Sequence, residues 1–432
     1  MKLDLFIRNL AWEGLRPETR EMTRRCVLDA LGCSLAGVEA DNFLALVRGI
    51  KGLDAGMESP VWGTELFTSL PWSIFLNSYT TAFFDMDDGH RLAQGHPGAA
   101  IIPAALCTAH YLDSSGKVFL EAVVIGYEIA VRSALLMREM GGPRKGSGAW
   151  VVPGVTAAVS RLMNLNPEKI LSAMGMAEFM ALQAPQDRSA SFPSLTKEGL
   201  PWGAYTGFMA AFLASHGMSG MLPYLADSLL LSDLAERYEI EDVYFKQYAC
   251  CRWAHPAIDG LRKMFEELGH RENEIDQVSI RTFEKALLDQ RIPVNTVEAV
   301  YSIPFDVASY LVHGKLGPRE VSGDALKDPR IRSLYDRIHL IADPELTKQF
   351  PAKCLQQIEV TFKTGEHYES GILSAKGDPA CPFSEDELLT KFKRLTENRV
   401  GERWRGIPKT VGVLEHKRAS ELVDLLTGSR KD

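Results

Sequence analysis

The hydrophobic residues of the first part of the chain recur with the spacing of a helix. Within residues 17–38 the apolar side chains fall on one broad face, and Gly37 provides a stop. In one later segment, Asn166 is a suitable helix cap and Pro167 occupies the first helical position. Helices that are apolar on most sides are usually buried against other helices, so an all-helical domain is expected. Similar apolar segments follow at 69–88, 96–116, 117–140, 152–166, 166–182 and 203–220.

The pattern changes near residue 268. Residues 272–283 and 356–370 alternate apolar and polar positions, as half-buried strands do, and a Thr-Gly turn follows the alternation of the second. Helical pieces lie between them, and Ser384 with Glu387 forms a capping box for a later helix. The apolar positions of the two strands are Ile275, Val278 and Ile280, and Ile358, Val360 and Phe362.

These patterns divide the chain into two domains of a mainly α fold. We predict a large all-helical domain over residues 1–267 and a smaller α+β domain over 268–399. The C-terminal segment 400–432 is expected to rejoin the helical domain. A chain of 432 residues also exceeds the size at which a single core keeps growing, which favours two domains.

Composition and charge narrow the class of partner. The chain is 46% hydrophobic and 24% charged, as an ordinary globular protein is. A formal net charge of −8, with the signs interleaved, argues against nucleic acid or an anionic membrane as the partner. There is no apolar run of about 18 residues, and the N-terminus does not resemble a signal peptide. The seven cysteines follow neither a disulfide nor an iron–sulfur spacing, so we expect a cytoplasmic protein.

The candidate chemistry centres on the stretch DMDDGHRLAQGHPG, residues 85–98. Pro97 suits the first position of the following helix, which makes His96 the capping residue. The positive helix end would favour an anion and disfavour an imidazolium, so a neutral His96 beside a bound carboxylate would serve as a general base. The alternative is that His96 only caps the helix and the aspartates face solvent.

The same stretch raises the question of a metal site. Asp and His side chains can hold a divalent ion. However, Asp85, Asp87 and Asp88 followed by His90 match no compact ligand spacing. We therefore expect no metal.

Two later segments add candidate cations and a second histidine. Lys197 lies in a stretch bounded by Pro and Gly, where it could clamp a carboxylate or stabilise an enolate-like charge. Lys246, Arg252 and His255 lie among aromatic residues, and His255 begins a second His-Pro pair. The alternatives are a solvated lysine and a histidine that only serves the core or a cap. The chain has no phosphate loop, dinucleotide fingerprint or nucleophile elbow, so proton transfer without a cofactor fits, as does a binding protein.

Six segments in order resemble the MmgE/PrpD family, whose members include 2-methylcitrate dehydratase, cis-aconitate decarboxylase and iminodisuccinate epimerase. Together they cover most of the chain. The first is FFDMDDGHRLAQGHPGAAIIPAAL, and the others are VPGVTAAVSRLMNLNPEKILSAMGMA, TKEGLPWGAYTGFMAAFLASHGMSG, KQYACCRWAHPAIDGL, YSIPFDVA and GDPACPFSEDELLTKF.

The resemblance implies a homodimer with a cofactor-independent site between a helical domain and a lid. It implies a small di- or tricarboxylic acid as substrate and removal of a proton next to a carboxylate. By matching motifs, the catalytic residues would be Asp85, His96, Lys197 and His255. Other family members place the last histidine where this chain has Cys251. The residues expected to bind the substrate are Asp88, His90, Lys246, Arg252 and Gly98.

Two departures bear on the type of reaction. Gly89 stands where the decarboxylase branch has Thr, and Phe305 stands where some members have Tyr. Both disfavour decarboxylation, so we predict a hydro-lyase of the 2-methylcitrate dehydratase type. An epimerase using the same site is the first alternative, and it would be favoured if His96 faced His255 or Lys197 across about 6–8 Å. A non-catalytic carboxylate-binding protein is the second.

Overall fold

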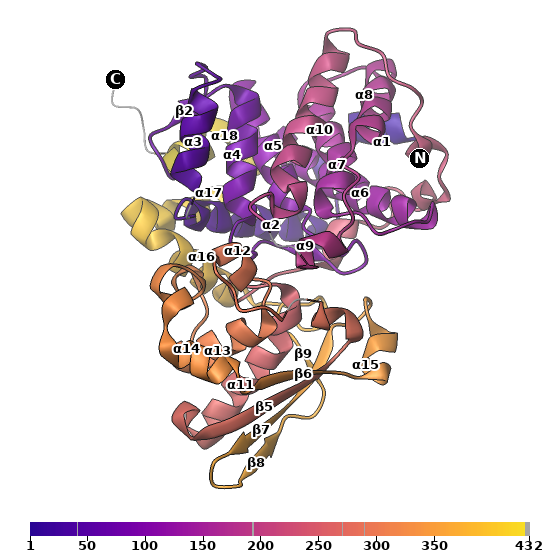
Figure 1. Ribbon diagram of the computed structural model, residues 1–432. Coiled ribbons are helices and arrows are strands. Elements are labelled where there is room, and N and C mark those ends of the chain that lie inside the picture. The colour runs from indigo at the N-terminus through magenta and orange to yellow at the C-terminus, as the bar shows by residue number, and fades with distance from the viewer. Residues whose placement is uncertain (41, 192–193, 270, 289, 428–432) are drawn as a thin grey trace.

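The computed structural model describes residues 1–40, 42–191, 194–269, 271–288 and 290–427. Figure 1 shows an upper, helical part in indigo to magenta and a lower part in orange that carries the main sheet. The fold is mainly α, as predicted. Among the described residues, no helix combines the length and the apolar character needed to cross a membrane.

The helical part is built from the first ten helices and three helices near the C-terminus. The predicted cap is confirmed, because the Asn166 side chain accepts a hydrogen bond from the Lys169 N–H at the start of α8. The first ten are α1 (Leu3–Asn9), α2 (Pro17–Gly37), α3 (Phe43–Lys51), α4 (Leu70–Ala82), α5 (Gly98–Tyr111), α6 (Gly116–Glu139), α7 (Ser147–Leu162), α8 (Pro167–Met180), α9 (Asp187–Ser191) and α10 (Leu200–Ser215), and the last three are α16 (Glu385–Val400), α17 (Gly406–Gly412) and α18 (Ala419–Thr427).

Small residues let the central helices approach closely. A Cβ atom added to Gly154 of α7 would lie 2.5 Å from Ala130 Cβ and 2.6 Å from the Gly126 carbonyl oxygen, both on α6. Such distances are incompatible with any side chain larger than hydrogen, so Gly154 fixes how α6 and α7 pack. The Ala- and Gly-rich pattern of these segments therefore reflects close helix contact.

The lower part contains a sheet with strand order β6-β5-β7-β8, and β9 also pairs with β7. Strand β5 runs parallel to β6 and antiparallel to β7. The predicted inward-facing residues of β5 and β7 are all buried, which confirms both strands. The strands are β5 (Ile275–Thr282), β6 (Ile338–Ala342), β7 (Leu355–Phe362), β8 (His367–Glu369) and β9 (Leu373–Ser374), and the helices of this part are α11 (His255–Leu268), α12 (Thr296–Ala299), α13 (Ile303–His313), α14 (Pro329–Tyr335) and α15 (Pro344–Gln349).

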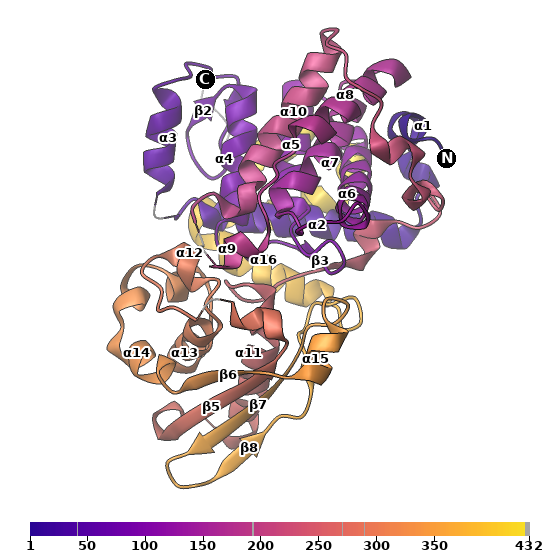
Figure 2. The same cartoon turned by 45° about the vertical axis from the view of Figure 1, so that its right-hand side comes forward.

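The two parts are joined through α16, which both views place between them (Figures 1 and 2). The predicted capping box of Ser384 and Glu387 is present at its start. Its Lys391 ammonium lies 2.5 Å from Asp29 Oδ1 of α2 and 2.7 Å from the Met86 carbonyl oxygen. The helix falls within the predicted segment 268–399 yet packs on the helical part. The exact division into domains stays a prediction.

Short strand pairs complete the fold. Strand β1 (Ser59–Pro60) pairs with β2 (Phe67–Thr68), and β3 (Gly89–His90) pairs with β4 (Val243–Tyr244). The second pair ties the acid-rich stretch of the sequence to the segment that leads into α11. It therefore brings the two regions of predicted chemistry together.

Candidate active site

The acid-rich stretch forms a buried loop between α4 and α5. Helix α4 ends at Ala82, and Asp85 follows with a left-handed backbone, φ 55°. The loop closes through a hydrogen bond from the His90 N–H to the Gly95 carbonyl oxygen. All three aspartates and both histidines are buried, so the alternative in which the aspartates face solvent is wrong.

The predicted anion at the start of α5 is a side chain of the protein itself. Asp88 Oδ1 accepts a hydrogen bond from the Gly98 N–H at 3.0 Å, and Asp88 Oδ2 accepts one from the Tyr127 hydroxyl. Burial raises the pKa of Asp88 to about 7, against the hydrogen bond from Tyr127. A Cβ on Gly98 would lie 2.4 Å from the Tyr127 hydroxyl oxygen, so this approach requires glycine.

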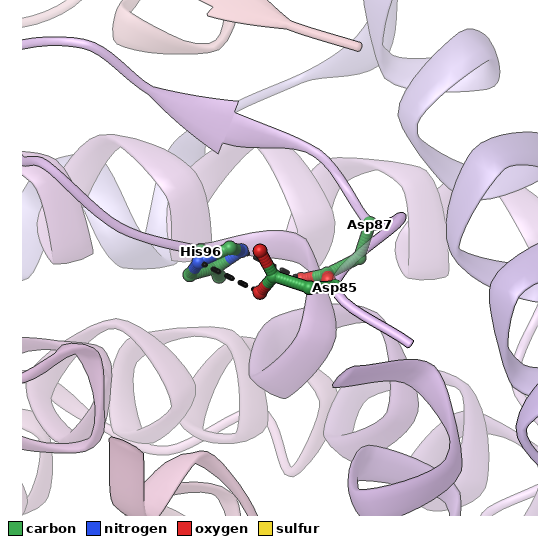
Figure 3. Close-up of side chains that lie close together, drawn as sticks. All are labelled: Asp85, Asp87 and His96. Carbon is green, nitrogen blue, oxygen red and sulfur yellow. Dashed lines mark hydrogen bonds and ion pairs between the residues drawn. The ribbon is translucent and has the colours of Figure 1, made fainter. Parts of the chain in front are cut away.

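The predicted capping role of His96 is wrong. Pro97 directly precedes the helix, and the His96 ring turns instead toward two carboxylates (Figure 3). Its Nδ1 lies 3.1 Å from Asp87 Oδ2, and its Nε2 lies 3.5 Å from Asp85 Oδ1. The expectation of a disfavoured imidazolium is also wrong. Burial and Lys246 lower the pKa of His96, but Asp87 and Asp85 outweigh them and hold it above its usual value.

Lys246 is fully buried and contacts this histidine. Its Nζ donates to the Asp85 carbonyl oxygen at 2.7 Å and lies 3.4 Å from Asp85 Oδ2, 3.9 Å from Asp87 Oδ1 and 3.3 Å from His96 Nδ1. Burial lowers the pKa of Lys246, but the charges of the two aspartates raise it by more. The net pKa therefore lies above the usual range for lysine. Likewise, burial raises the pKa of Asp85, yet Lys246 and His96 hold it well below normal. The cluster is thus a compact set of buried, compensating charges.

A second ammonium reaches Asp85 from a strained turn. Lys197, Glu198 and Gly199 all have positive φ, of 44°, 56° and 75°. Left-handed backbone costs about 1–2 kcal/mol for each residue other than glycine, and such strain concentrates at functional sites. The turn places Lys197 Nζ 3.8 Å from Asp85 Oδ1 and 5.0 Å from the centre of the Tyr301 ring. Within the described chain this ammonium is buried and has no hydrogen-bond acceptor.

Among the residues that the structure describes, two groups of side chains have the spacing of metal ligands. In the first, Asp85, Asp87 and His96 offer ligand atoms within 4.8 Å of one another, but the Lys246 ammonium lies among them. Like charge opposes a divalent cation at that position. The second group is His90, Glu239 and Asp242, and there Arg237 pairs with both carboxylates. In both groups, protein cations already compensate the carboxylates.

The cluster borders a cavity of ≈ 630 Å³, counted with its open mouth. Four of the predicted site residues line it, namely Asp85, His90, His96 and Arg252. Lys197 and Lys246 are not among the lining residues, but their ammonium nitrogens lie 3.8 and 3.4 Å from the carboxylate of Asp85, which is one of them. Asp88, Gly98 and His255 are not among the lining residues.

His90 and Arg252 are both held by the protein. His90 Nδ1 accepts a hydrogen bond from the Ala93 N–H, and its Nε2 lies 3.4 Å from Glu239 Oε2. With Nδ1 as an acceptor, Nε2 is the ring nitrogen that faces Glu239. Arg252 donates to three backbone carbonyls and pairs with Asp378 at 2.8 Å, while its Nε has no acceptor within the described chain.

His255 is fully buried in the core of the lower part. Its Nε2 lies 3.3 Å from the Cys250 carbonyl oxygen, and its ring packs against Tyr248. Burial, together with Arg252 and Lys246, lowers the pKa of His255 well below its usual value. His255 is therefore not among the residues that line the cavity, although its charge interacts with that of Lys246 in the group around His96.

Cys251 lines the cavity, and so do residues that the sequence analysis did not single out, namely Arg91, Glu198, Lys285 and Tyr301. Arg91 and Arg252 both pair with Asp378 Oδ1 and flank the Tyr244 ring, at 4.7 and 4.9 Å. Arg91 directly follows the predicted site residue His90 in the sequence, so its position in the chain could have indicated that it belongs to the site. Lys285 and Tyr301 reach the cavity only through tertiary folding.

The fold and the site together define a class: mainly α proteins with an imidazole, carboxylates and ammonium groups gathered beside a cavity. Comparison with protein families gives the same class a name. Residues 2–237 match the MmgE/PrpD N-terminal domain and residues 248–415 match the MmgE/PrpD C-terminal domain. The chain belongs to the MmgE/PrpD family.

Curated relatives match over nearly the whole chain. The cis-aconitate decarboxylase-like protein oryM of Aspergillus oryzae is 24% identical, with 94% of this chain and 93% of the relative covered. The cis-aconitate decarboxylase of Homo sapiens is 23% identical, with 94% and 89% covered. The 2-methylcitrate dehydratase of Escherichia coli strain K12 is 24% identical, with 93% and 91% covered. These relatives are named as enzymes, which supports an enzyme here.

Proposed function

We propose that this protein is a cofactor-independent hydro-lyase that removes a proton next to a carboxylate of a small di- or tricarboxylic acid and eliminates water. One observation carries the proposal: His96 lies between two carboxylates at the wall of a cavity, with two buried ammonium groups against the same aspartate. The names of the relatives in the family add support, since they include dehydratases acting on such acids.

His96 is the proposed acid and base. A group whose pKa lies near the working pH can both take and return a proton, and the pKa of His96 lies above the usual value for histidine of about 6.5. Asp87 fixes the ring through Nδ1, which leaves Nε2 as the nitrogen that exchanges protons. Asp85 supports the imidazolium once it forms.

The cations are proposed to bind and stabilise the acid. Lys197, whose ammonium lacks a hydrogen-bond acceptor in the described chain, is suited to the negative charge that develops when a carbon next to a carboxylate loses its proton. Arg91 and Arg252 line the cavity and share one carboxylate partner, Asp378, so this pair of guanidinium groups keeps a net positive charge for a substrate carboxylate.

Proton NMR in heavy water tests the proposal. The wild-type protein is incubated with a panel of di- and tricarboxylates that includes 2-methylcitrate. We expect loss of water from at least one acid, and a rate at least about 100-fold lower in His96→Ala, the usual scale for a positioned acid or base. His216→Ala is the matched control, because His216 is exposed at the end of α10.

The same spectra separate the competing reactions. Loss of carbon dioxide would identify a decarboxylase, and deuterium exchange with inversion but without loss of water would identify an epimerase. A panel with neither exchange nor turnover would favour the non-catalytic carboxylate-binding protein. Activity that a chelator removes and one divalent ion restores would contradict the expectation of a metal-free site. The homodimer and the cytoplasmic location remain predictions alongside this proposal.

A further inference from the structure

Tyr301 brings a hydroxyl group from the lower part of the molecule into the cavity. It lies between α12 and α13, and its side chain lines the cavity together with Asp85 and His96. The hydroxyl donates to Glu198 Oε1 of the helical part at 3.4 Å. Tyr301 therefore bridges the two parts of the molecule at the site.

The strained turn at 197–199 supplies both partners of Tyr301. Glu198 is fixed independently, since its Oε2 accepts hydrogen bonds from the Ser147 N–H at 3.2 Å and the Ser147 hydroxyl at 2.7 Å. Lys197 places its ammonium over the Tyr301 ring and against Asp85. The left-handed backbone of two consecutive residues thus directs the Glu198 carboxylate toward the Tyr301 hydroxyl and the Lys197 ammonium toward the Tyr301 ring.

The surroundings suit a tyrosine that gives up a proton only during reaction. Burial, together with Glu198 and Asp85, raises the pKa of Tyr301 well above its usual value, so the hydroxyl is protonated at rest. Once the proton has left, the Lys197 ammonium over the ring would stabilise the tyrosinate. The Tyr301 hydroxyl therefore keeps its proton until a basic group of the bound substrate accepts it.

The other hydroxyl and thiol groups of the cavity are placed differently. The Tyr244 ring is held between Arg91 and Arg252, at the cationic wall. Burial raises the pKa of the Cys251 thiol, with a further contribution from Asp85. Among these three side chains, only Tyr301 has a hydroxyl group that donates to a carboxylate, that of Glu198. Its ring also lies under the Lys197 ammonium, which contacts Asp85.

We propose that the Tyr301 hydroxyl is the acid that protonates the leaving hydroxyl group of the substrate. The inference rests on the proposed hydro-lyase activity and assigns its second proton transfer. His96 takes the proton from carbon, and the electron pair of that C–H bond forms the double bond. The C–O bond breaks, and the hydroxyl leaves as water with the proton of Tyr301. One proton then passes from the imidazolium to the tyrosinate, directly or through water, and restores both groups.

The experiment compares Tyr301→Phe with the wild type and with His96→Ala in heavy water, with 2-methylcitrate as the first probe and the wider acid panel after it. Phenylalanine keeps the ring under Lys197 and removes only the hydroxyl. Tyr301→Phe is expected to lose elimination by about 100-fold or more while it still exchanges the substrate proton for deuterium. His96→Ala should lose both. Tyr310→Phe is the matched control, because Tyr310 is a buried tyrosine of α13 that does not line the cavity.

Two results would overturn the inference. One is elimination by Tyr301→Phe within about threefold of the wild-type rate, well short of the loss expected for a positioned acid. The other is a parallel loss of elimination and exchange in a protein with an unchanged melting temperature, since that would give Tyr301 a positioning role only. Failure of the proposed function looks different, because the wild-type protein itself would then neither exchange nor eliminate.

Discussion

His96 and His255 each precede a proline at the start of a helix, and yet their surroundings are opposite. His96 lies between Asp85 and Asp87 at the cavity, and its pKa is raised. His255 lies among apolar side chains with a backbone carbonyl as its partner, and its pKa is lowered. The same dipeptide therefore predicts a helix start in both places and a proton-transfer group in neither. The charges that other segments bring decide that role.

The difference extends to the residues around each histidine. Lys246 and two carboxylates surround His96, so a proton on the ring is compensated. Around His255, the charges that act most strongly are the cations Arg252 and Lys246, which oppose a second positive charge. Burial has the same sign for both histidines, so the nearby carboxylates explain the contrast.

The largest change in the surroundings of His96 is expected when the positive charge of Lys246 is removed. Lys246→Met would leave Asp85 and Asp87 buried with one fewer compensating cation. Removing one partner of a buried ion pair costs about 3–5 kcal/mol, so we expect that decrease in the free energy of unfolding, together with loss of turnover. Urea unfolding measures it. Lys263→Met on the exposed face of α11 is the control, and a loss under about 1 kcal/mol in Lys246→Met would contradict the compensating role.

A smaller effect concerns Asp88, behind the same loop. The folded protein holds a proton on Asp88 up to about pH 7, whereas an unfolded chain loses it near pH 4. Between these values the folded state binds more protons, so this group makes the free energy of unfolding fall as pH rises, by at most about 1.4 kcal/mol per pH unit.

Asp88→Asn should remove that contribution. The amide oxygen can still accept from the Gly98 N–H, and the amide nitrogen can donate to the Tyr127 oxygen. Urea unfolding at pH 5, 6 and 7 is the measurement. The difference in stability between variant and wild type should grow in favour of the variant as pH rises, and parallel curves for the two proteins would show that Asp88 is ionised throughout.

The smallest expected effect on activity is at His255. In His255→Gln the amide nitrogen can replace Nε2 as the donor to the Cys250 carbonyl oxygen. Turnover should stay within about threefold of wild type, because the ring lies outside the cavity lining. A loss comparable to that of His96→Ala would give His255 the catalytic role predicted from the family motif.

His255 and Asp88 affect the stability of the wild-type protein with opposite dependences on pH, and each substitution should remove one of them. Because the pKa of His255 is lowered on folding, the unfolded chain binds more protons below about pH 6.5. The wild type should therefore lose stability as pH falls below that value, by at most about 1.4 kcal/mol per pH unit, and His255→Gln should not. Urea unfolding between pH 5 and 7 checks this sign.

The sequence predicted elements better than it predicted contacts. The helices around Asn166 and Ser384, and the strands through Ile280 and Ile358, follow from capping residues and from the period of apolar positions, which are local properties. The cap at His96 failed because Asp88, eight residues earlier, satisfies the Gly98 N–H instead. That competition depends on a loop geometry that no periodicity encodes.

The sequence alone determined the mainly α fold, the two sheet strands, the family resemblance and the acid-rich stretch. The tertiary structure alone decided that His96 meets Asp85 and Asp87, that Lys197 and Lys246 converge on the same aspartate, and that Tyr301 reaches the cavity while His255 does not. The reason is physical. Periodicity and capping act over a few residues, whereas the pKa of a buried group depends on charges brought within a few ångströms by segments more than a hundred residues apart.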